Sequence, residues 1–503
     1  MVNFDDPNQI EIVDFVLPFS GRLDPNNKWI RLAKMIPWSE LAGKYTKKMC
    51  KDFGRLSIKP RVAIGALIIK HYKQMSDEDT IQDIQENPYL QYFLGYSSYQ
   101  FKPCFDPSLF VTIRKRLKAR EIEAINEIFI AKFKELRARE KEIKRSRRKP
   151  PKQDNAQLTN TEKNQGKLIV DATVAPSNIK YPTDLDLLNE SREISEHTID
   201  ILYTSGQFSE KPRTYRRLAR RDYLRIIKKK RKSNKVIRLG IRQQLQYLRR
   251  NFSHIGSMLV VLKEHPEALS LKELERLEVI RTIFSQQDEM YQKRVHSVKD
   301  RIVSIHQPQI RPMVRGKASA DVEFGPKLSL SVVDGFLYLD HLRWDAYNES
   351  LDLIAQVNKY RRQFGNFPKV VIADGIYGTR ENRRYLKEKG IRFSGKKLGR
   401  PPKELDMVAR EMEWLRVLEQ GERNEVEGKI GTAKTRYGLG KLMTKTEQTS
   451  ENWVAMAIFS MNMATALRRL LLSLFYRVKN RVKIARNLSL INCCPKAVPV
   501  TRW

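Results

Sequence analysis

The sequence predicts an α/β protein, with a mixed sheet core that follows a helical unit and is interrupted by a helical insertion after its first strand. Two apolar segments with strand character, 168–170 and 370–373, each lead directly into an aspartate. A further pair, 328–333 and 336–342, is separated by an Asp-Gly dipeptide, which is a strong hairpin signal. Apolar residues around these segments recur at helical spacing, and the helices that they predict would form the second layer of an α/β fold.

Residues 1–140 are expected to form an N-terminal helical domain. Residues 61–74 carry apolar side chains on one side at helical spacing. Asp106-Pro107 is expected to open another helix, with an N-cap followed by a proline in the first turn. The basic and polar composition of residues 141–166 indicates a linker.

The sheet core is expected to comprise residues 167–184 and 311–450. After the hairpin, whose turn residue is Asp334, a helix over 345–363 and a strand ending at Asp374 should follow. A helix over 380–389 and a short strand over 391–394 complete the alternation, which indicates a mixed sheet. Asp171 and Asp374 would then lie at strand ends within one sheet.

A strongly basic composition suggests a polyanionic partner. The 503 residues include 95 Lys plus Arg against 58 Asp plus Glu, a formal charge of +37. Membrane surfaces also attract cations, so charge alone does not identify the partner. The longest apolar run, 453–467, is short for a bilayer and precedes Arg468-Arg469, so we expect a buried helix within a C-terminal helix and basic tail, 451–503.

Residues 185–310 are expected to form a basic helical insertion that faces DNA. Between Lys211 and Arg250 there are 17 Lys or Arg residues and one acidic residue, Asp222, with tyrosines interleaved. A solvated helical surface is the alternative, but so few compensating acids favour contact with phosphates. The cations that we select as DNA-binding candidates are Arg216, Arg217, Arg220 and Arg221.

Cysteine usage and the N-terminus indicate a reducing cytosol. The four cysteines, at 50, 104, 493 and 494, have no spacing typical of zinc sites or disulfide frameworks. The chain starts Met-Val-Asn-Phe-Asp-Asp, without a basic start or an apolar secretory segment. We expect a cytoplasmic protein with no membrane partner.

Three carboxylates from separate elements are candidates for catalysis and metal binding: Asp171, Asp374 and Glu427. Such a set can hold a pair of divalent cations for phosphoryl transfer. Each residue also has an ordinary structural explanation, since an aspartate after a strand is often a turn or cap residue. The histidines do not cluster in any metal-ligand spacing, so zinc is not expected.

The predicted helix that carries Glu427 has a stripe on one face. Arg423, Glu427, Gly431 and Lys434 recur at helical spacing, whereas Glu425 faces the other side. An ordinary ladder of ion pairs is the alternative. A glycine within the stripe weakens a helix and makes more sense where another backbone approaches closely. Arg423 and Lys434 would then flank the metals and hold the DNA strand.

Several motifs resemble the DDE transposases of bacterial insertion sequences, in the group whose N-terminal helical domain precedes a ribonuclease H-like catalytic core. The resemblance covers most of the chain and includes the N-terminal stretch 60–117. Its signature, an arginine four residues before the glutamate and a lysine seven after, matches Arg423, Glu427 and Lys434. A tyrosine that often stands three residues before the arginine is Gln420 here, which puts a tyrosine-dependent DNA contact in doubt. The motifs that carry the resemblance are 171–176, 181–184, 373–378, 423–429 and 434–439.

The resemblance implies that Asp171, Asp374 and Glu427 bind two Mg²⁺ ions, for which Mn²⁺ can substitute. It implies cleavage at transposon ends and strand transfer into target DNA, without a covalent protein–DNA bond. The implied partners are double-stranded DNA, as terminal inverted repeats and as target, and a second copy of the chain in a synaptic complex. A bacterial, nucleoid-associated location follows.

Two other classes of function remain open. A nuclease of the same fold would hydrolyse DNA without joining it. A catalytically silent DNA-binding protein would keep its affinity for DNA after loss of all three carboxylates.

Overall fold

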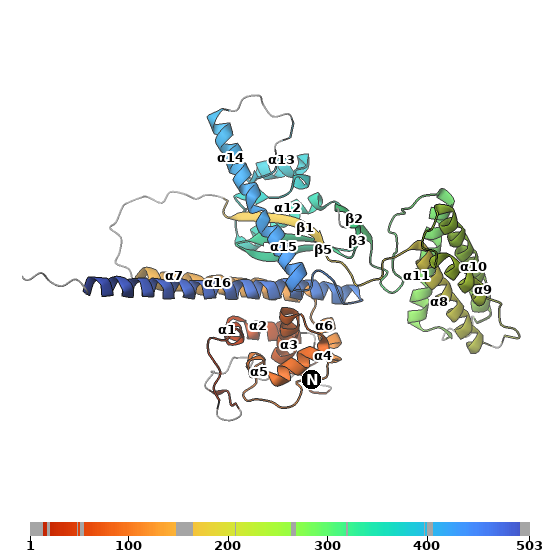
Figure 1. Ribbon diagram of the computed structural model, residues 1–503, viewed down its shortest axis with the longest axis horizontal. Coiled ribbons are helices and arrows are strands. Elements are labelled where there is room, and N and C mark those ends of the chain that lie inside the picture. The colour runs from red at the N-terminus through yellow and green to blue at the C-terminus, as the bar shows by residue number, and fades with distance from the viewer. Residues whose placement is uncertain are drawn as a thin grey trace, which may run out of the picture.

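A computed structural model describes residues 14–492, except 18–20, 48, 51–54, 147–163, 207, 263–267, 318–319, 397 and 400–405. Two long helices, α7 (Ala119–Ser146) and α16 (Glu447–Asn492), pack side by side through the middle of the molecule. The N-terminal helices lie on one side of this pair and the sheet on the other (Figure 1). Much of the predicted linker 141–166 lies outside the described residues.

Among the described residues, five strands form a mixed sheet in the order β5-β4-β1-β6-β7. β1 (Lys167–Val174) pairs antiparallel with β4 (Lys327–Val333) and parallel with β6 (Val370–Ile372). The predicted hairpin is confirmed, since β4 and β5 (Phe336–Arg343) are antiparallel, and Asp334 and Gly335 between them both have positive φ, 50° and 72°. β7 (Arg392–Phe393) completes the sheet parallel to β6.

The expected helix over 345–363 is wrong in its first half. A 3₁₀ turn, Glu349–Asp352, comes first, and α12 (Leu353–Phe364) starts only after it. Local side-chain hydrogen bonds explain the delay, because Asn348 caps the 3₁₀ turn by accepting from the Ser350 N–H at 3.1 Å. The expected helix 380–389 is confirmed as α13 (Arg380–Glu388).

The N-terminal helices bury one continuous apolar core. α3 (Pro60–Lys73) is buried on nearly every side, and it packs on α2 (Trp38–Thr46), α4 (Asp77–Glu86), α6 (Leu109–Arg116) and α16. The expected start at Asp106 is two residues early. Asp106 accepts from the Ser108 N–H at 2.9 Å and so forms a turn before α6 (Leu109–Arg116). The other helices of this unit are α1 (Lys28–Met35), α2 (Trp38–Thr46), α4 (Asp77–Glu86) and α5 (Pro88–Phe93).

Between β1 and the hairpin of β2 (Pro312–Lys317) and β3 (Ala320–Phe324), the described chain is helical. These helices have a core of their own, and they project from the sheet in Figure 1. α8 (Asp184–Ser205) and α10 (Asn234–Val261) form the main packing pair. The helices are α8 (Asp184–Ser205), α9 (Arg216–Ile227), α10 (Asn234–Val261) and α11 (Leu271–Lys293).

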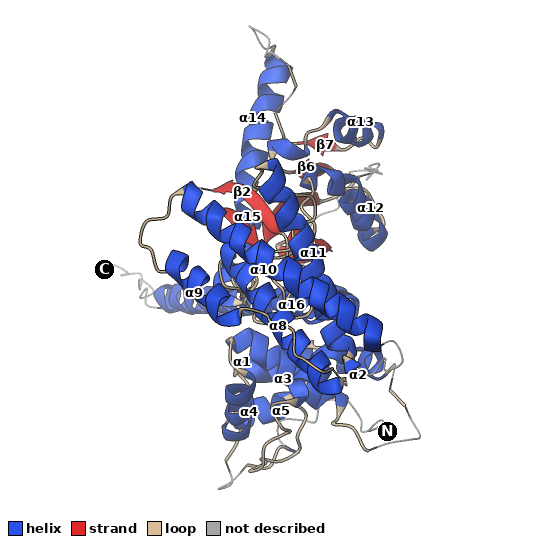
Figure 2. Cartoon of the chain, turned by 90° about the vertical axis from the view of Figure 1, so that its right-hand side faces the viewer, coloured by secondary structure: helices blue, strands red, loops and turns tan. Residues whose placement is uncertain are grey.

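The chain after β7 forms α14 (Met407–Glu422), α15 (Asn424–Arg436) and α16. α14 extends away from the sheet in both views (Figures 1 and 2). Residues 447–471 of α16 are the one described helix long and apolar enough to cross a membrane, but 72% of its most apolar window is buried inside the protein. Its neighbours are α7, α3 and β5, which is the packing of a core helix.

Candidate active site

The sheet brings Asp171 and Asp374 to the same level. In the parallel pair of β1 and β6, Ile169 is opposite Ile372. Each aspartate lies two residues beyond its isoleucine, and residues two apart on a strand share a face. Asp171 therefore shares the face of Ile169, and Asp374 follows the end of the neighbouring strand at the same level.

The expectation that both aspartates end their strands is correct only for β6. β1 continues to Val174, because antiparallel pairing with β4 holds residues 169–174, with Asp171 opposite Leu330. β6 stops at Ile372 because Asp374 turns the chain, and its Oδ1 accepts from the Gly375 N–H at 2.6 Å. Asp171 thus has the more rigid backbone of the two.

Helix α15 places Glu427 over the same face. Val426 and Ala433 of this helix are completely buried, and they belong to the apolar cluster that contains Ile169 and Ile372. α15 therefore packs on β1 and β4 with one side, and Glu427, the neighbour of Val426, lies at the edge of that contact. The helix that the sequence predicted around Glu427 is confirmed.

Arg423, at the junction of α14 and α15, links the carboxylates. Its Nη1 lies 3.1 Å from Asp374 Oδ1, and its Nε donates to Glu427 Oε1 at 3.1 Å. The hydrogen bond to Glu427 raises the pKa of the guanidinium most, and the negative charges of Asp374, Glu427 and Asp171 raise it further. All three candidate carboxylates therefore act on one cation.

The donor set suits a hard divalent cation. All three side chains offer carboxylate oxygens, the ligands that Mg²⁺ and Mn²⁺ prefer. Within the described part of the chain, no three His, Cys, Asp or Glu side chains converge closely enough to hold a metal ion as they stand. Instead a guanidinium lies among the carboxylates, so this is a place where the protein stabilises positive charge.

The neighbours of Glu427 on α15 follow the predicted stripe. Gly431 is exposed, and a Cβ added to it would meet nothing within 4 Å. Glu425 lies on another side of the helix, where its Oε1 is close to the β4–β5 turn at Gly335. Gln420 of α14 accepts from Ser394 Oγ at 3.1 Å and so ties α14 to the end of β7.

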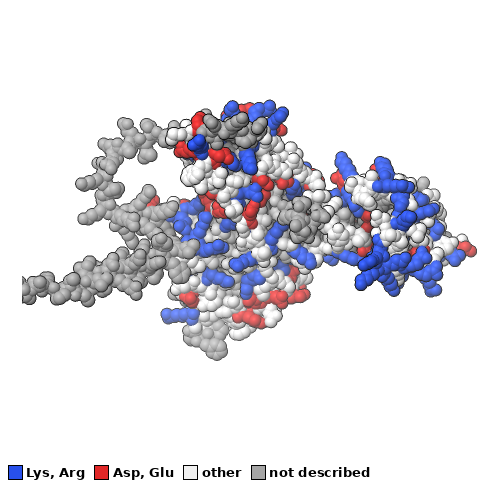
Figure 3. Space-filling view, turned by 45° about the horizontal axis from the view of Figure 1, so that its top comes forward, with Lys and Arg blue, Asp and Glu red and all other residues white. Residues whose placement is uncertain are grey.

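The basic insertion presents its cations on the surface. Figure 3 shows Lys and Arg gathered over this part of the molecule. Arg216 pairs with Asp200 at 2.7 Å, whereas Arg217, Arg220 and Arg221 are exposed and have no ion pair within the described residues. The acidic Asp222 is buried and accepts from the Tyr247 hydroxyl at 3.0 Å, and its Oδ1 lies 3.7 Å from Arg225, so it balances one cation of α9.

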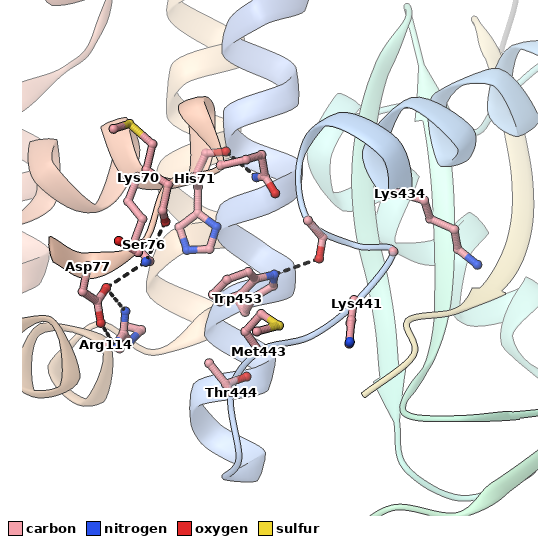
Figure 4. A pocket seen from close by; sticks show the side chains of 14 residues that line it. Lys70, His71, Ser76, Asp77, Arg114, Lys434, Lys441, Met443, Thr444 and Trp453 are labelled. Atoms are coloured by element: carbon pink, nitrogen blue, oxygen red, sulfur yellow. Dashed lines mark hydrogen bonds and ion pairs between the residues drawn. The ribbon is translucent and has the colours of Figure 1, made fainter. Parts of the chain in front are cut away.

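One group of residues was not recognisable from the sequence. A cavity near the C-terminal end of α15 is lined by residues distant in sequence, among them His71, Arg114, Lys441 and Trp453 (Figure 4). His71 lies inside an apolar helical stretch and gives no motif. Lys434, which the sequence did select, also lines this cavity.

Two parts of the chain match family models of transposase domains. A family model described as a transposase DDE domain matches residues 371–464, and one described as a transposase domain matches residues 18–116. The uncharacterized protein ORF8 in the nfe locus of Rhizobium meliloti is 26% identical over 217 residues, which cover 41% of this chain and 89% of that protein. No solved structure matches the chain.

Proposed function

This chain belongs to the DDE transposases of insertion sequences, and from that premise we propose that it cleaves DNA at the ends of its element and joins them to target DNA. The observation that carries the proposal is that Arg423 pairs with both Asp374 and Glu427 and lies within the electrostatic influence of Asp171. The carboxylates come from β1, from the end of β6 and from α15, so the packed sheet and helix hold them together.

We assign the sheet and α15 to a ribonuclease H-like catalytic core. The mixed sheet with β1 at its centre, and the helix that packs across it, support this assignment. The core is interrupted by the basic insertion, which we assign to DNA binding. The N-terminal helices, which include the matched transposase domain, would serve DNA binding or dimerisation.

DDE transposases act with divalent metal ions, and Asp171, Asp374 and Glu427 are the residues that would hold two of them, Mg²⁺ or Mn²⁺, in this chain. Bound cations would supply the charge that activates the attacking oxygen and stabilises the leaving one. Asp171 would be the most fixed ligand, because the ladder between β1 and β4 immobilises its backbone.

The cationic side chains of the stripe would hold the DNA. Arg423 can offer its guanidinium to a phosphate once its carboxylate partners bind metal, because the fork of N–H donors matches phosphate as well as carboxylate. Lys434 lies seven residues after Glu427 on α15, which is a distance of about 10 Å along the helix at 1.5 Å per residue. The two would contact phosphates on either side of Glu427 and align the strand.

The partners that this function requires are double-stranded DNA, both as terminal inverted repeats and as target, and a second copy of the chain. Pairing of two ends favours a homodimer in the synaptic complex. The bacterial cytoplasm, at the nucleoid, is the corresponding location.

The test uses purified full-length protein, DNA fragments with the inverted repeats that flank its gene, a supercoiled target plasmid, and MgCl₂. We expect cleavage at the repeat ends and recombinant products joined to the plasmid. Cleavage without joined products would identify a nuclease. Binding of the repeats without either reaction, at any Mg²⁺ or Mn²⁺ concentration, would identify a silent DNA-binding protein.

The basic insertion gives a prediction about DNA affinity. Replacing Arg217, Arg220 and Arg221 together with Ala should weaken binding to duplex DNA and reduce the slope of log K against log salt by roughly one unit per lost phosphate contact. These three arginines are exposed and lack ion pairs among the described residues, so their charge is available to phosphate. Fluorescence anisotropy at several salt concentrations measures the slope.

A matched control removes the same charge elsewhere in the insertion. Lys272, Arg281 and Arg294 are exposed cations on and after α11. Their replacement with Ala should change the slope by less than half as much. An equal loss of slope would mean that net charge, and not the surface of α9, governs binding.

The exposed glycine of the stripe gives a second prediction. Gly431→Leu should reduce cleavage at least tenfold, because a bulky side chain would stand between α15 and the DNA backbone. The fold should be unharmed, since the added Cβ meets nothing within 4 Å and a helical glycine costs about 1 kcal/mol relative to a good helix former. Melting temperature and cleavage rate are measured on the same preparation.

Gly428→Leu is the control, because a Cβ at this exposed glycine also meets nothing within 4 Å and the residue lies about 100° around the helix from Glu427. It should cut at nearly the wild-type rate. Equal losses in both variants would contradict the assignment of the stripe to DNA.

A further inference from the structure

Asp374 is held less firmly by the sheet than Asp171. The last pairing of β1 with β6 joins Ile169 to Ile372, two residues before Asp374. Beyond that pair the chain turns at Asp374 and forms a 3₁₀ turn, Gly375–Tyr377. Asp171, by contrast, lies inside the ladder between β1 and β4. Another contact must therefore set the distance between the two carboxylates.

Asn382 supplies such a contact from the first turn of α13. Its side-chain Nδ2 donates to the Tyr377 carbonyl at 2.9 Å and to the Ser350 carbonyl at 2.8 Å. Only 4% of the residue is exposed. One amide group therefore joins the 3₁₀ turn after Asp374 to the 3₁₀ turn before α12.

The backbone of Asn382 is fixed as well. Thr379 caps α13, and its Oγ1 accepts from the Asn382 N–H at 3.2 Å. Arg383, the next residue, donates from Nε to the Gly378 carbonyl at 2.9 Å. The start of α13 and the turn after Asp374 thus form one hydrogen-bonded unit.

The turn that contains Ser350 is anchored on β4. The buried carboxylate of Asp352, at the end of this turn, accepts hydrogen bonds from the hydroxyls of Ser329 and Tyr347. Lys327 donates to the Tyr347 carbonyl at 2.8 Å. Ser329 and Lys327 both belong to β4, so the turn is held on the sheet.

The strand that anchors this turn is also the strand that holds Asp171. β4 pairs with residues 169–174 of β1, with Asp171 opposite Leu330. The connection from β4 to Asp171 is the ladder itself, and the connection from β4 to Asp374 runs through the anchored turn and Asn382. The two carboxylates are thus held on the same strand from two directions.

We propose that Asn382 is a positioning residue, which holds Asp374 at the separation from Asp171 that a shared divalent cation requires. In this role it touches neither a cation nor DNA and acts through the backbone that follows Asp374. The inference rests on the proposed function in one respect, since it takes Asp374 as a metal ligand. Residues that orient metal ligands through hydrogen bonds typically contribute about tenfold to a hundredfold to metal affinity.

The first test measures Mn²⁺ affinity without DNA, by electron paramagnetic resonance of free Mn²⁺. Asn382→Ala removes both hydrogen bonds and should weaken the affinity roughly tenfold. Asn382→Leu removes the same hydrogen bonds but keeps the size of the side chain, so it should fold even if the void left by alanine does not allow folding, and should give the same loss. A wild-type affinity in a folded variant would overturn the proposal.

Asn462→Ala is the matched control. Asn462 of α16 is completely buried, and its Nδ2 donates to the Leu337 carbonyl at 2.7 Å and to Asn126 Oδ1 at 3.0 Å. The substitution also removes two buried hydrogen bonds, so the melting temperature should fall by a similar amount. Its Mn²⁺ affinity should equal that of the wild type. Equal weakening in both alanine variants would mean that Asn382 acts through general stability, which contradicts the proposal.

A double-mutant cycle identifies the residue through which Asn382 acts. In the Asp374→Asn background the ligand that Asn382 would position is gone. A further Asn382→Ala should therefore change the remaining Mn²⁺ affinity less than about twofold. A full tenfold loss on top of Asp374→Asn would assign the effect to another part of the site and refute the role.

The dependence of cleavage on Mn²⁺ separates this role from the proposed function. Asn382→Ala should need roughly tenfold more Mn²⁺ for half-maximal cleavage, while its rate at saturating Mn²⁺ stays within about threefold of the wild type. A lower saturated rate with an unchanged Mn²⁺ requirement would rule out positioning. A wild type that binds Mn²⁺ but cuts no DNA would refute the transposase activity alone, because the binding measurements still decide the role of Asn382. Normal cleavage and joining, with unaltered Mn²⁺ affinity in Asn382→Ala, would refute the positioning role alone.

Discussion

Asp171→Asn, Asp374→Asn and Glu427→Gln are each expected to reduce DNA cleavage and joining at least a hundredfold while binding of duplex DNA persists. Each amide keeps the shape of the side chain but removes the charge that would hold a divalent cation. DNA affinity should survive, because the exposed arginines of the basic insertion are untouched. Gel assays of cleavage and joining, beside anisotropy for binding, measure both quantities on the same preparation.

Glu425→Gln is the matched control for this series. Glu425 is two residues from Glu427, but its carboxylate lies beside the β4–β5 turn at Gly335. The same chemical change should therefore leave cleavage nearly normal. A variant of Asp171, Asp374 or Glu427 that kept a tenth of the wild-type rate would remove that residue from the catalytic set. Loss of DNA binding together with cleavage would indicate a structural role.

The sequence was informative wherever a signal is local. The Asp334-Gly335 hairpin and the helix around Glu427 depend on turn chemistry and helical spacing within a few residues, and both are present. The proximity of Asp171 and Asp374 required only that two apolar strands share one sheet. Neighbouring residues determine each of these elements, and only the pairing of β1 with β6 is a long-range contact.

The sequence was less informative where another interaction extends, delays or displaces the expected element. The extension of β1 past Asp171 depends on pairing with β4, more than 150 residues away. The late start of α12 and of α6 follows from side-chain hydrogen bonds that compete with the helix. The cavity that contains His71 exists only because α3 packs beside α16. No spacing along the chain indicates such a contact.

Arg423 was expected to flank the metals, and its position now suggests a competition with them. The guanidinium contacts Asp374 and Glu427, two of the three carboxylates that would hold the cations. A divalent ion that binds these carboxylates must break both ion pairs. Their carboxylate side chains are 56% and 47% exposed, so each pair contributes only about 0.2–1 kcal/mol.

Arg423→Gln should therefore tighten metal binding and at the same time impair the reaction. Removing two exposed ion pairs that compete with the metal should raise the affinity for Mn²⁺ roughly threefold to tenfold. Cleavage should fall at least tenfold, because the arginine that would hold a phosphate beside Glu427 is lost. Electron paramagnetic resonance of free Mn²⁺ measures the affinity in the absence of DNA, independently of any activity.

Arg416→Gln is the control for this change, since Arg416 pairs with Glu413 on α14 and contacts none of the three carboxylates in the described structure. Its affinity for Mn²⁺ should equal that of the wild type. In the metal-free protein, only Arg423→Gln leaves the carboxylates without a cation. Addition of Mn²⁺ should therefore raise the melting temperature of Arg423→Gln more than that of Arg416→Gln. An unchanged Mn²⁺ affinity in Arg423→Gln would mean that the metals bind beside the guanidinium and do not replace it.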